Sequence, residues 1–214
     1  MLNNPESVPG VNNAQCALIL AQGGCHTKFH FLMAKIIRKT PVNLILIGFM
    51  ATGKSTLART LAPGLGFDVV DTDDLIIERA GKPIAEIFSD IGQEGFRDLE
   101  SGILKDFLNR ERMVISTGGG IVTRPGNIEI LRSLGMVIWL NASIDVIIQR
   151  AAKSDGRPLL KADDPRRSVE ELLAGRVELY REAADECIDV DDLSSEELAY
   201  GIAESARVWF ARSH

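Results

Sequence analysis

The chain has 214 residues, of which 45% are hydrophobic and 25% charged, and its formal net charge is −6. This size and balance are typical of one globular domain with a substantial core. The acidic charge excludes nucleic-acid binding by general electrostatic attraction, and no apolar run reaches the roughly 18 to 20 residues of a membrane helix. Three scattered cysteines favour no disulfide framework, so we expect a soluble cytoplasmic protein without nucleic-acid or membrane partners.

Residues 1–40 differ in composition from the rest of the chain. Asparagine, glycine and proline are frequent early in this segment, Glu6 is its only acid, and no amphipathic repeat is sustained. It does not have the pattern of a secretory signal, and it is poor in the serine and arginine of a transit peptide. We expect an N-terminal extension that is disordered or results from an over-extended gene start, because Met33 lies a few residues before the first predicted strand.

Short apolar segments alternate with amphipathic ones over residues 41–214. The predicted strands are Val42–Ile47, Phe67–Val70, Met113–Ser116, Met136–Leu140 and Glu186–Val190. The predicted helices are Lys54–Ala62, a pair within residues 73–110, Ile128–Leu134, Ile144–Arg150, Val169–Ala184 and a last one from Ser195 to Phe210. Strands without clean alternation suit a parallel sheet covered on both faces. The pattern therefore predicts a three-layer, doubly wound α/β domain that binds ligands at the carboxyl ends of its strands.

The first predicted strand is followed by a phosphate-binding motif. Residues 48–56 read G-F-M-A-T-G-K-S-T and fit G-x-x-x-x-G-K-[ST] without a mismatch. Glycines let successive backbone N–H groups converge on phosphates, and the next helix offers its positive end. Lys54 is expected to reach the β- and γ-phosphates, and the Ser55 hydroxyl to bind Mg²⁺. The alternative is an ordinary Gly-rich turn between a strand and a helix.

Acidic residues follow the second predicted strand, in Asp71-Thr72-Asp73-Asp74. While the chain stays extended, Asp71 and Asp73 share a face. Asp71 could then hold Mg²⁺, and Asp73 could accept a hydrogen bond from the hydroxyl to be phosphorylated. The alternative is an acidic helix start, with Asp73 or Asp74 capping a helix that begins near Leu75. Capping is the favoured interpretation for Asp74, and function is the favoured one for Asp73.

Two further segments are weak signals by themselves. Arg97 lies in a charged helical stretch, where a surface position is the simplest interpretation. Gly118, Gly119 and Gly120 follow the third predicted strand, at the sheet edge that carries the phosphate loop. Glycines there allow a ligand to touch the backbone and offer N–H groups to an anion.

The segment of residues 151–166 is small, polar and basic as far as Pro158, and it suggests a mobile lid. Closure of such a lid brings Arg157 over the transferring phosphoryl group and excludes water. On the next predicted helix, Arg176 and Tyr180 are four residues apart. Arg176 is either a site residue or a charge on the helix surface.

Taken together, G-F-M-A-T-G-K-S-T, D-T-D, F-R-x-x-E, G-G-G, R-P-L-L and R-x-x-L-Y resemble the shikimate kinase family, from about Val42 to about Val190. The phosphate loop is shared by many enzymes, whereas the other motifs in this order are specific to that family. The resemblance implies the nucleoside monophosphate kinase fold, with a five-stranded parallel sheet, substrate-binding helices at about 73–110 and a lid. It also implies transfer of the γ-phosphoryl group of ATP to the 3-hydroxyl of shikimate.

The resemblance assigns roles to single residues. Catalysis falls to Asp73, Lys54 and Arg157, and Mg²⁺ to Ser55 and Asp71. ATP is expected to be bound by Ala51, Thr52, Gly53, Lys54, Ser55, Thr56, Arg150 and Arg157. Shikimate is expected to be bound by Asp73, Arg97, Gly118, Gly119, Gly120 and Arg176. Two arginines suit a carboxylate substrate, because a guanidinium fork matches a carboxylate geometrically, and Glu100 is expected to fix Arg97 from the same helix.

Two alternatives stay open. A kinase of this fold acting on gluconate fits the arginines as well, because gluconate is also an anion. A regulatory module that binds ATP without phosphorylating a metabolite is the alternative from another class. The segment Asp189-Val190-Asp191-Asp192 stands where many relatives have a basic or polar residue, which leaves the adenine contacts open. A monomer is the default expectation.

Overall fold

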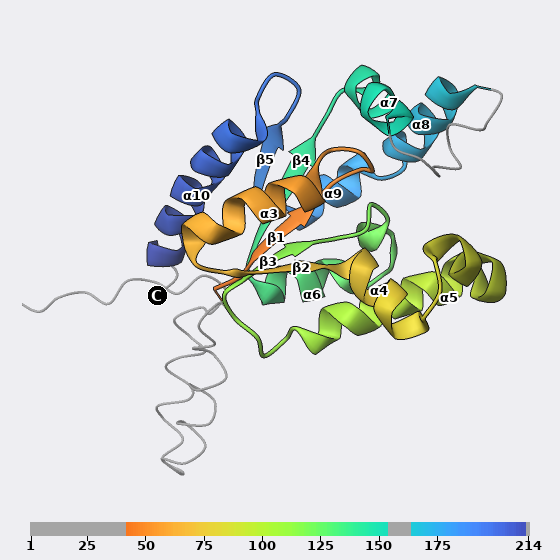
Figure 1. The fold of residues 1–214 in the computed structure, drawn as a ribbon, viewed down its shortest axis with the longest axis horizontal. Helices are drawn as coiled ribbons and strands as arrows, with labels where there is room; N and C mark the ends of the chain where they lie inside the picture. The colour runs from red at the N-terminus through yellow and green to blue at the C-terminus, as the bar shows by residue number, and fades with distance from the viewer. Residues whose placement is uncertain (1–41, 154–163, 213–214) are drawn as a thin grey trace, which may run out of the picture. The chain divides into compact units, whose positions relative to one another are not determined.

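The computed structural model describes residues 42–153 and 164–212. Within these ranges, five strands form one all-parallel sheet in the order β2-β3-β1-β4-β5, with helices on both sides (Figure 1). The strands are β1 (Leu44–Ile47), β2 (Asp68–Asp71), β3 (Met113–Ser116), β4 (Met136–Asn141) and β5 (Glu186–Asp189). The predicted α/β fold is confirmed, and each strand lies close to its predicted bounds.

The described helices are α3 (Lys54–Leu65), α4 (Thr72–Ala80), α5 (Ile84–Asp106), the short 3₁₀ helix η1 (Ile121–Thr123), α6 (Asn127–Leu134), α7 (Ile144–Ala152), α8 (Pro165–Ala174), α9 (Val177–Ala183) and α10 (Ser195–Arg212). None of them is at once long and apolar enough to cross a membrane. The extension over residues 1–40 and most of the lid segment 151–166, including Arg157, lie outside the described ranges.

The prediction of one helix over Val169–Ala184 is wrong, because the chain forms two helices there. The backbone N–H of Arg176 bonds to the carbonyl of Leu173 at 2.8 Å, a tight i−3 contact that ends α8. Arg176 itself has φ −123° and stands before α9 rather than inside a helix. Gly175, at this break, is a poor helix former and is typical of helix ends.

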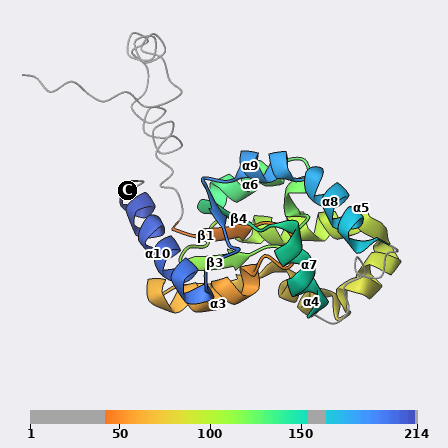
Figure 2. The same cartoon turned by 90° about the horizontal axis from the view of Figure 1, so that it is seen from above.

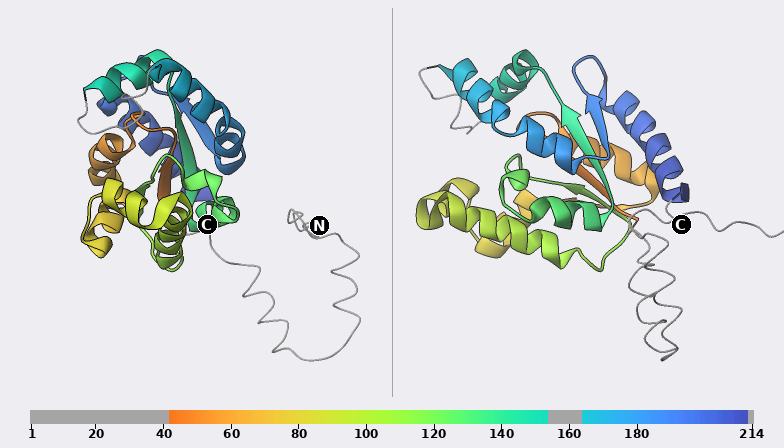
Figure 3. Two further views of the ribbon diagram at one scale, coloured as in Figure 1. Left: turned by 90° about the vertical axis from the view of Figure 1, so that its right-hand side faces the viewer. Right: turned by 180° about the vertical axis from the view of Figure 1, so that it is seen from behind.

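The core is split by the sheet into two halves, because successive strand side chains point to opposite faces. Leu44 and Leu46 pack toward α3 and α10, whereas Ile45 and Ile47 pack toward α5, α6 and α9. All four side chains are fully buried, as expected for a central parallel strand. Figure 2 shows the sheet between the two helix layers, and Figure 3 shows α6 and α9 over the second face.

The strand order decides which loops meet. β1 lies between β3 and β4, and β2 pairs with the far side of β3. The loop after β1 and the segments that follow β2 and β3 therefore converge at one carboxyl edge of the sheet. This is the place where open α/β sheets bind their ligands.

Candidate active site

The phosphate loop joins β1 to α3, and its shape depends on glycine. Gly48 has φ +139°, and a Cβ there would lie 2.4 Å from the carbonyl oxygen of Leu140. Gly53 has φ +97° at the N-cap of α3. The loop curls around the Nζ of Lys54, which donates to the carbonyls of Gly48 at 2.9 Å and Phe49 at 2.6 Å. The result is an anion cradle at the start of a helix.

A cavity of about 590 Å³ opens over this loop. Its walls include Met50, Ala51, Gly53, Lys54, Ser55 and Thr56, together with Asp73, Thr117, Gly119 and Arg150. Arg150 reaches it from α7, and its guanidinium donates to the carbonyls of Thr52 at 3.3 Å and Val190 at 3.1 Å. Six of the eight residues predicted to bind the nucleotide thus share one cavity with Asp73. Thr52 is not among the lining residues, and Arg157 lies outside the described ranges.

The acidic segment takes a different form from the one predicted. Asp71 is extended and caps α4, because its carboxylate accepts the N–H of Asp73 at 3.0 Å. The helix begins at Thr72, so the prediction that Asp74 caps a helix from Leu75 is wrong. The expectation that Asp71 and Asp73 share one face of an extended strand is wrong for the same reason. Asp73 instead lies in the first turn of α4.

The environment of Asp73 is mixed in charge. Burial raises the pKa of this carboxyl, and the neighbouring carboxylate of Asp71 raises it further. Lys54 and Arg97 oppose that rise. Asp73 is therefore a more basic carboxylate than one in water, held beside two cations.

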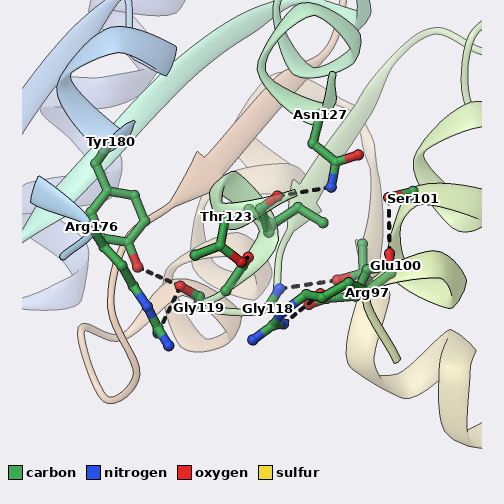
Figure 4. A network of polar contacts seen from close by, with 12 residues as sticks. Arg97, Glu100, Ser101, Gly118, Gly119, Thr123, Asn127, Arg176 and Tyr180 are labelled. Atoms are coloured by element: carbon green, nitrogen blue, oxygen red, sulfur yellow. Dashed lines mark hydrogen bonds and ion pairs between the residues drawn. The ribbon is translucent and has the colours of Figure 1, made fainter. Parts of the chain in front are cut away.

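Arg97 and Glu100 form a buried pair against the loop Gly118–Gly120, which follows β3 and is called the glycine loop below. Arg97 Nη1 donates to Glu100 Oε2 at 2.5 Å, and the two residues are 8% and 0% exposed (Figure 4). The surface interpretation of Arg97 is therefore wrong, because the second half of α5 packs into the core. Burial raises the pKa of Glu100, and Arg97 opposes this. Among the described residues, Arg97 Nε and Glu100 Oε1 are buried without a hydrogen-bond partner.

Gly118 and Gly120 have no room for side chains of their own, because neighbouring side chains fill the space. A Cβ on Gly118 would lie 2.4 Å from Glu100 Oε1 and 2.9 Å from Asp73 Oδ1. A Cβ on Gly120 would lie 2.1 Å from Arg97 Nη2. The glycines therefore let Asp73, Arg97 and Glu100 approach the backbone of the loop.

Arg176 approaches the same loop from the other side. Its Nη1 donates to the carbonyl of Gly119 at 3.2 Å, and its guanidinium carbon lies 5.4 Å from the centre of the Phe49 ring. Figure 4 shows Arg97 and Arg176 on opposite sides of Gly118 and Gly119. Two guanidinium groups thus flank a loop whose middle residue lines the cavity.

Sequence reasoning missed three polar contacts of this site. Thr72 Oγ1 accepts the N–H of Gly118 at 3.1 Å, and Ser116 Oγ lies 3.2 Å from Ser55 Oγ. The Tyr180 hydroxyl donates to the carbonyl of Gly119 at 2.5 Å. Each lies within or beside a quoted motif, but a hydroxyl has no signal of its own until its partner from another strand or helix is known.

Comparisons with known proteins agree with this geometry. The sequence model of the shikimate kinase family matches residues 50–207. The shikimate kinase of Thermodesulfovibrio yellowstonii is 44% identical over 157 residues, covering 73% of this chain and 90% of the relative. That of Halorhodospira halophila is 38% identical over 167 residues, covering 78% and 94%. A solved shikimate kinase from Acinetobacter baumannii, in complex with shikimate, has a TM-score of 0.74 and 34% identity, covering 79% of this chain and 95% of that one. The chain belongs to the shikimate kinase family.

Proposed function

We propose that this chain transfers the γ-phosphoryl group of ATP to the 3-hydroxyl of shikimate. The product is shikimate 3-phosphate, an intermediate in the biosynthesis of chorismate and the aromatic amino acids. The observation that carries the proposal is the meeting of a phosphate loop, the carboxylate of Asp73 and two arginines at one glycine loop. Family membership supports both the reaction and the acceptor.

ATP binds with its phosphates in the loop from Ala51 to Thr56. Backbone N–H groups and the start of α3 attract the phosphates, and Lys54 neutralises charge at the β- and γ-phosphates. Arg150 stands at the edge of the cavity between Thr52 and Val190, where it can lie against the base. Arg157, outside the described ranges, is proposed as the lid arginine near the β–γ bridge.

The residues at the phosphate loop fit Mg²⁺. Ser55 supplies a hydroxyl and Asp71 a carboxylate, and Mg²⁺ prefers such oxygen ligands while keeping several waters. When bound, Mg²⁺ neutralises charge on the phosphate oxygens.

Asp73 prepares the acceptor hydroxyl. Its carboxylate accepts the hydroxyl proton while the acceptor oxygen bonds to the γ-phosphorus and the bond to the β–γ bridging oxygen breaks, which leaves ADP. The raised pKa of Asp73 makes the carboxylate a better proton acceptor. The neighbouring Lys54 and Arg97 stabilise its charged form.

The two arginines recognise the acceptor carboxylate. Arg97 and Arg176 flank the glycine loop, and each guanidinium can donate two parallel hydrogen bonds to a carboxylate. Glu100 holds Arg97 in place, because the pair is buried and its geometry is fixed. Gly119 lines the cavity and lets the acceptor ring approach the backbone, whereas Gly118 and Gly120 make room for the side chains of Asp73, Arg97 and Glu100 beside it.

We also propose one catalytic domain over residues 41–214, with substrate-binding helices at about 73–110 and a lid at about 151–166. A cytoplasmic monomer is the proposed form of the protein. The unpaired thiol of Cys187 is compatible with a reducing compartment.

The test is ADP release from ATP in a coupled assay, measured with shikimate, with gluconate and without acceptor. We expect release that depends on shikimate and on Mg²⁺, and that stops when EDTA removes the metal. Release with gluconate instead would assign the site to another acceptor. Bound ATP with no release in any mixture would favour a regulatory module.

A further inference from the structure

The carbonyl oxygen of Gly119 accepts hydrogen bonds from two side chains, that of Arg176, the residue before α9, and that of Tyr180, within α9. Arg176 Nη1 donates at 3.2 Å and the Tyr180 hydroxyl at 2.5 Å. A carbonyl has two lone pairs, so both can be served at once. Figure 4 shows the two dashed contacts converging on this oxygen from α9.

Packing holds the side chain of Tyr180 in one position. The residue is fully buried, and its ring stacks on Trp139 of β4 with centroids 5.8 Å apart. Burial raises the pKa of the phenol to about 12, so the hydroxyl stays protonated and donates. Arg176 is different, because its long side chain is only partly buried and its guanidinium lies over the Phe49 ring.

Gly119 also touches the phosphate loop. A Cβ on Gly119 would lie 3.1 Å from the backbone nitrogen of Met50 and 3.4 Å from the carbonyl oxygen of Gly48. A shift of Gly119 would therefore change the spacing between the glycine loop and the phosphate loop. The geometry of phosphoryl transfer depends on such spacing, since catalysis here is mainly positioning.

We infer that Tyr180 is a positioning residue, whose hydroxyl holds the Gly119 carbonyl in place when Arg176 turns to the carboxylate of the acceptor. The inference rests on the proposed function. In the free protein, both donors bond to the carbonyl, and Arg176 also forms a hydrogen bond with the Tyr180 side chain. In the acceptor complex, Tyr180 remains as the donor to this carbonyl and keeps the Gly118–Gly120 backbone at its distance from the phosphate loop.

The variant Tyr180→Phe tests this directly, because it keeps the ring on Trp139 and removes only the hydroxyl. We expect the KM for shikimate to rise about 2- to 10-fold, the effect of losing one buried hydrogen bond. The KM for ATP should change little, whereas kcat should fall by a similar factor, because a shift of Gly119 changes the spacing between the glycine loop and the phosphate loop. The dissociation constant of shikimate without ATP, from calorimetry, should rise by the same factor.

Two further variants separate positioning from stability. Tyr200→Phe removes the hydroxyl of the second tyrosine of the chain, which is 74% exposed on α10, and should leave every constant unchanged. Ile202→Val, at a buried position of α10 on the other face of the sheet from Tyr180, should lower Tm without a selective rise in the KM for shikimate.

The inference is overturned if Tyr180→Phe lowers Tm, or fails to fold, without a selective loss of shikimate affinity, because the hydroxyl would then be structural. An unchanged shikimate KM in a folded Tyr180→Phe protein would also overturn it. A parent protein that is inactive toward shikimate would refute the proposed function instead.

Discussion

The two parts of the site that we propose for the nucleotide and for the acceptor are built in different ways. The nucleotide side is mainly one continuous segment, residues 48–56, whose shape depends on backbone dihedrals at Gly48 and Gly53. The acceptor side draws Asp73, Arg97 and Arg176 from three separate segments onto a glycine loop that follows β3. Phosphate binding by backbone N–H groups tolerates changes in distant side chains, whereas acceptor binding depends on how several elements pack. Acceptor-side substitutions should therefore spare nucleotide binding.

The largest expected effect is that of Asp73→Asn. We expect kcat to fall by about 10²- to 10⁴-fold, because the acceptor hydroxyl loses its proton acceptor. ATP binding, measured by calorimetry, should be nearly unchanged. Asp106→Asn is the matched control, since the Asp106 side chain is exposed at the end of α5 and pairs with Arg79 at 2.5 Å. Near-normal turnover of Asp73→Asn would remove this residue from the mechanism.

Arg176→Ala should separate the two sides most clearly. The KM for shikimate is expected to rise by about 10- to 100-fold, because charge-assisted hydrogen bonds to a carboxylate are lost. The KM for ATP should change little. Arg181→Ala, at an exposed position of α9, the helix that Arg176 precedes, provides the control and should behave as the parent protein. Equal losses for both substrates would show that the two sides are not independent.

Gly120→Ala tests whether the Arg97 guanidinium packs so tightly on Gly120 that no side chain fits there. The new methyl group would meet the guanidinium, so we expect the free energy of unfolding to fall by about 1–3 kcal/mol. Shikimate affinity should fall in parallel, because Arg97 must move. Gly201→Ala, in α10 with open space around it, should instead stabilise the protein by about 0.5–1 kcal/mol. Chemical denaturation measures both, and a neutral Gly120→Ala would mean that Arg97 has room to adjust.

The smallest expected effect concerns a side chain on the nucleotide side. Asp191 accepts the N–H of Ser143 at 3.0 Å and 3.2 Å, and so ties the loop after β5 to the start of α7. Arg150 of α7 donates to Val190 in that same loop. Asp191→Ala should raise the KM for ATP about 2- to 5-fold, as expected for an exposed hydrogen bond, and leave the KM for shikimate unchanged. Asp192→Ala should change neither constant, and a rise in both variants would indicate a general charge effect.

Sequence reasoning succeeded where structure is local. The phosphate motif and the strand bounds were readable because each depends on a few adjacent residues. It failed where local signals competed. Asp73 and Asp74 were the expected caps of this helix, and only the end of pairing between β2 and β3 decides in favour of Asp71. Likewise, the apolar spacing before and after Gly175 reads as one helix, although α8 ends there.

Arg97 is the clearest case in which the local sequence did not predict the position of a site residue. Its neighbours in the sequence are charged, and a surface position was the simplest interpretation, yet its guanidinium is buried beside Glu100 and Gly120. Only resemblance to a family pointed to its proposed role. The roles of Tyr180 and Thr72 were likewise invisible, because each hydroxyl finds its partner in a loop far away in the sequence.

The sequence by itself determined the alternation of strands and helices, the phosphate loop and the family, because periodicity and a contiguous motif depend on short-range geometry. The tertiary structure alone decided which loops meet, which cap begins α4 and which hydroxyls hold the glycine loop. The physical reason is the strand order β2-β3-β1-β4-β5, which brings segments far apart in the chain to one edge of the sheet, where burial and unsatisfied hydrogen bonds select their partners.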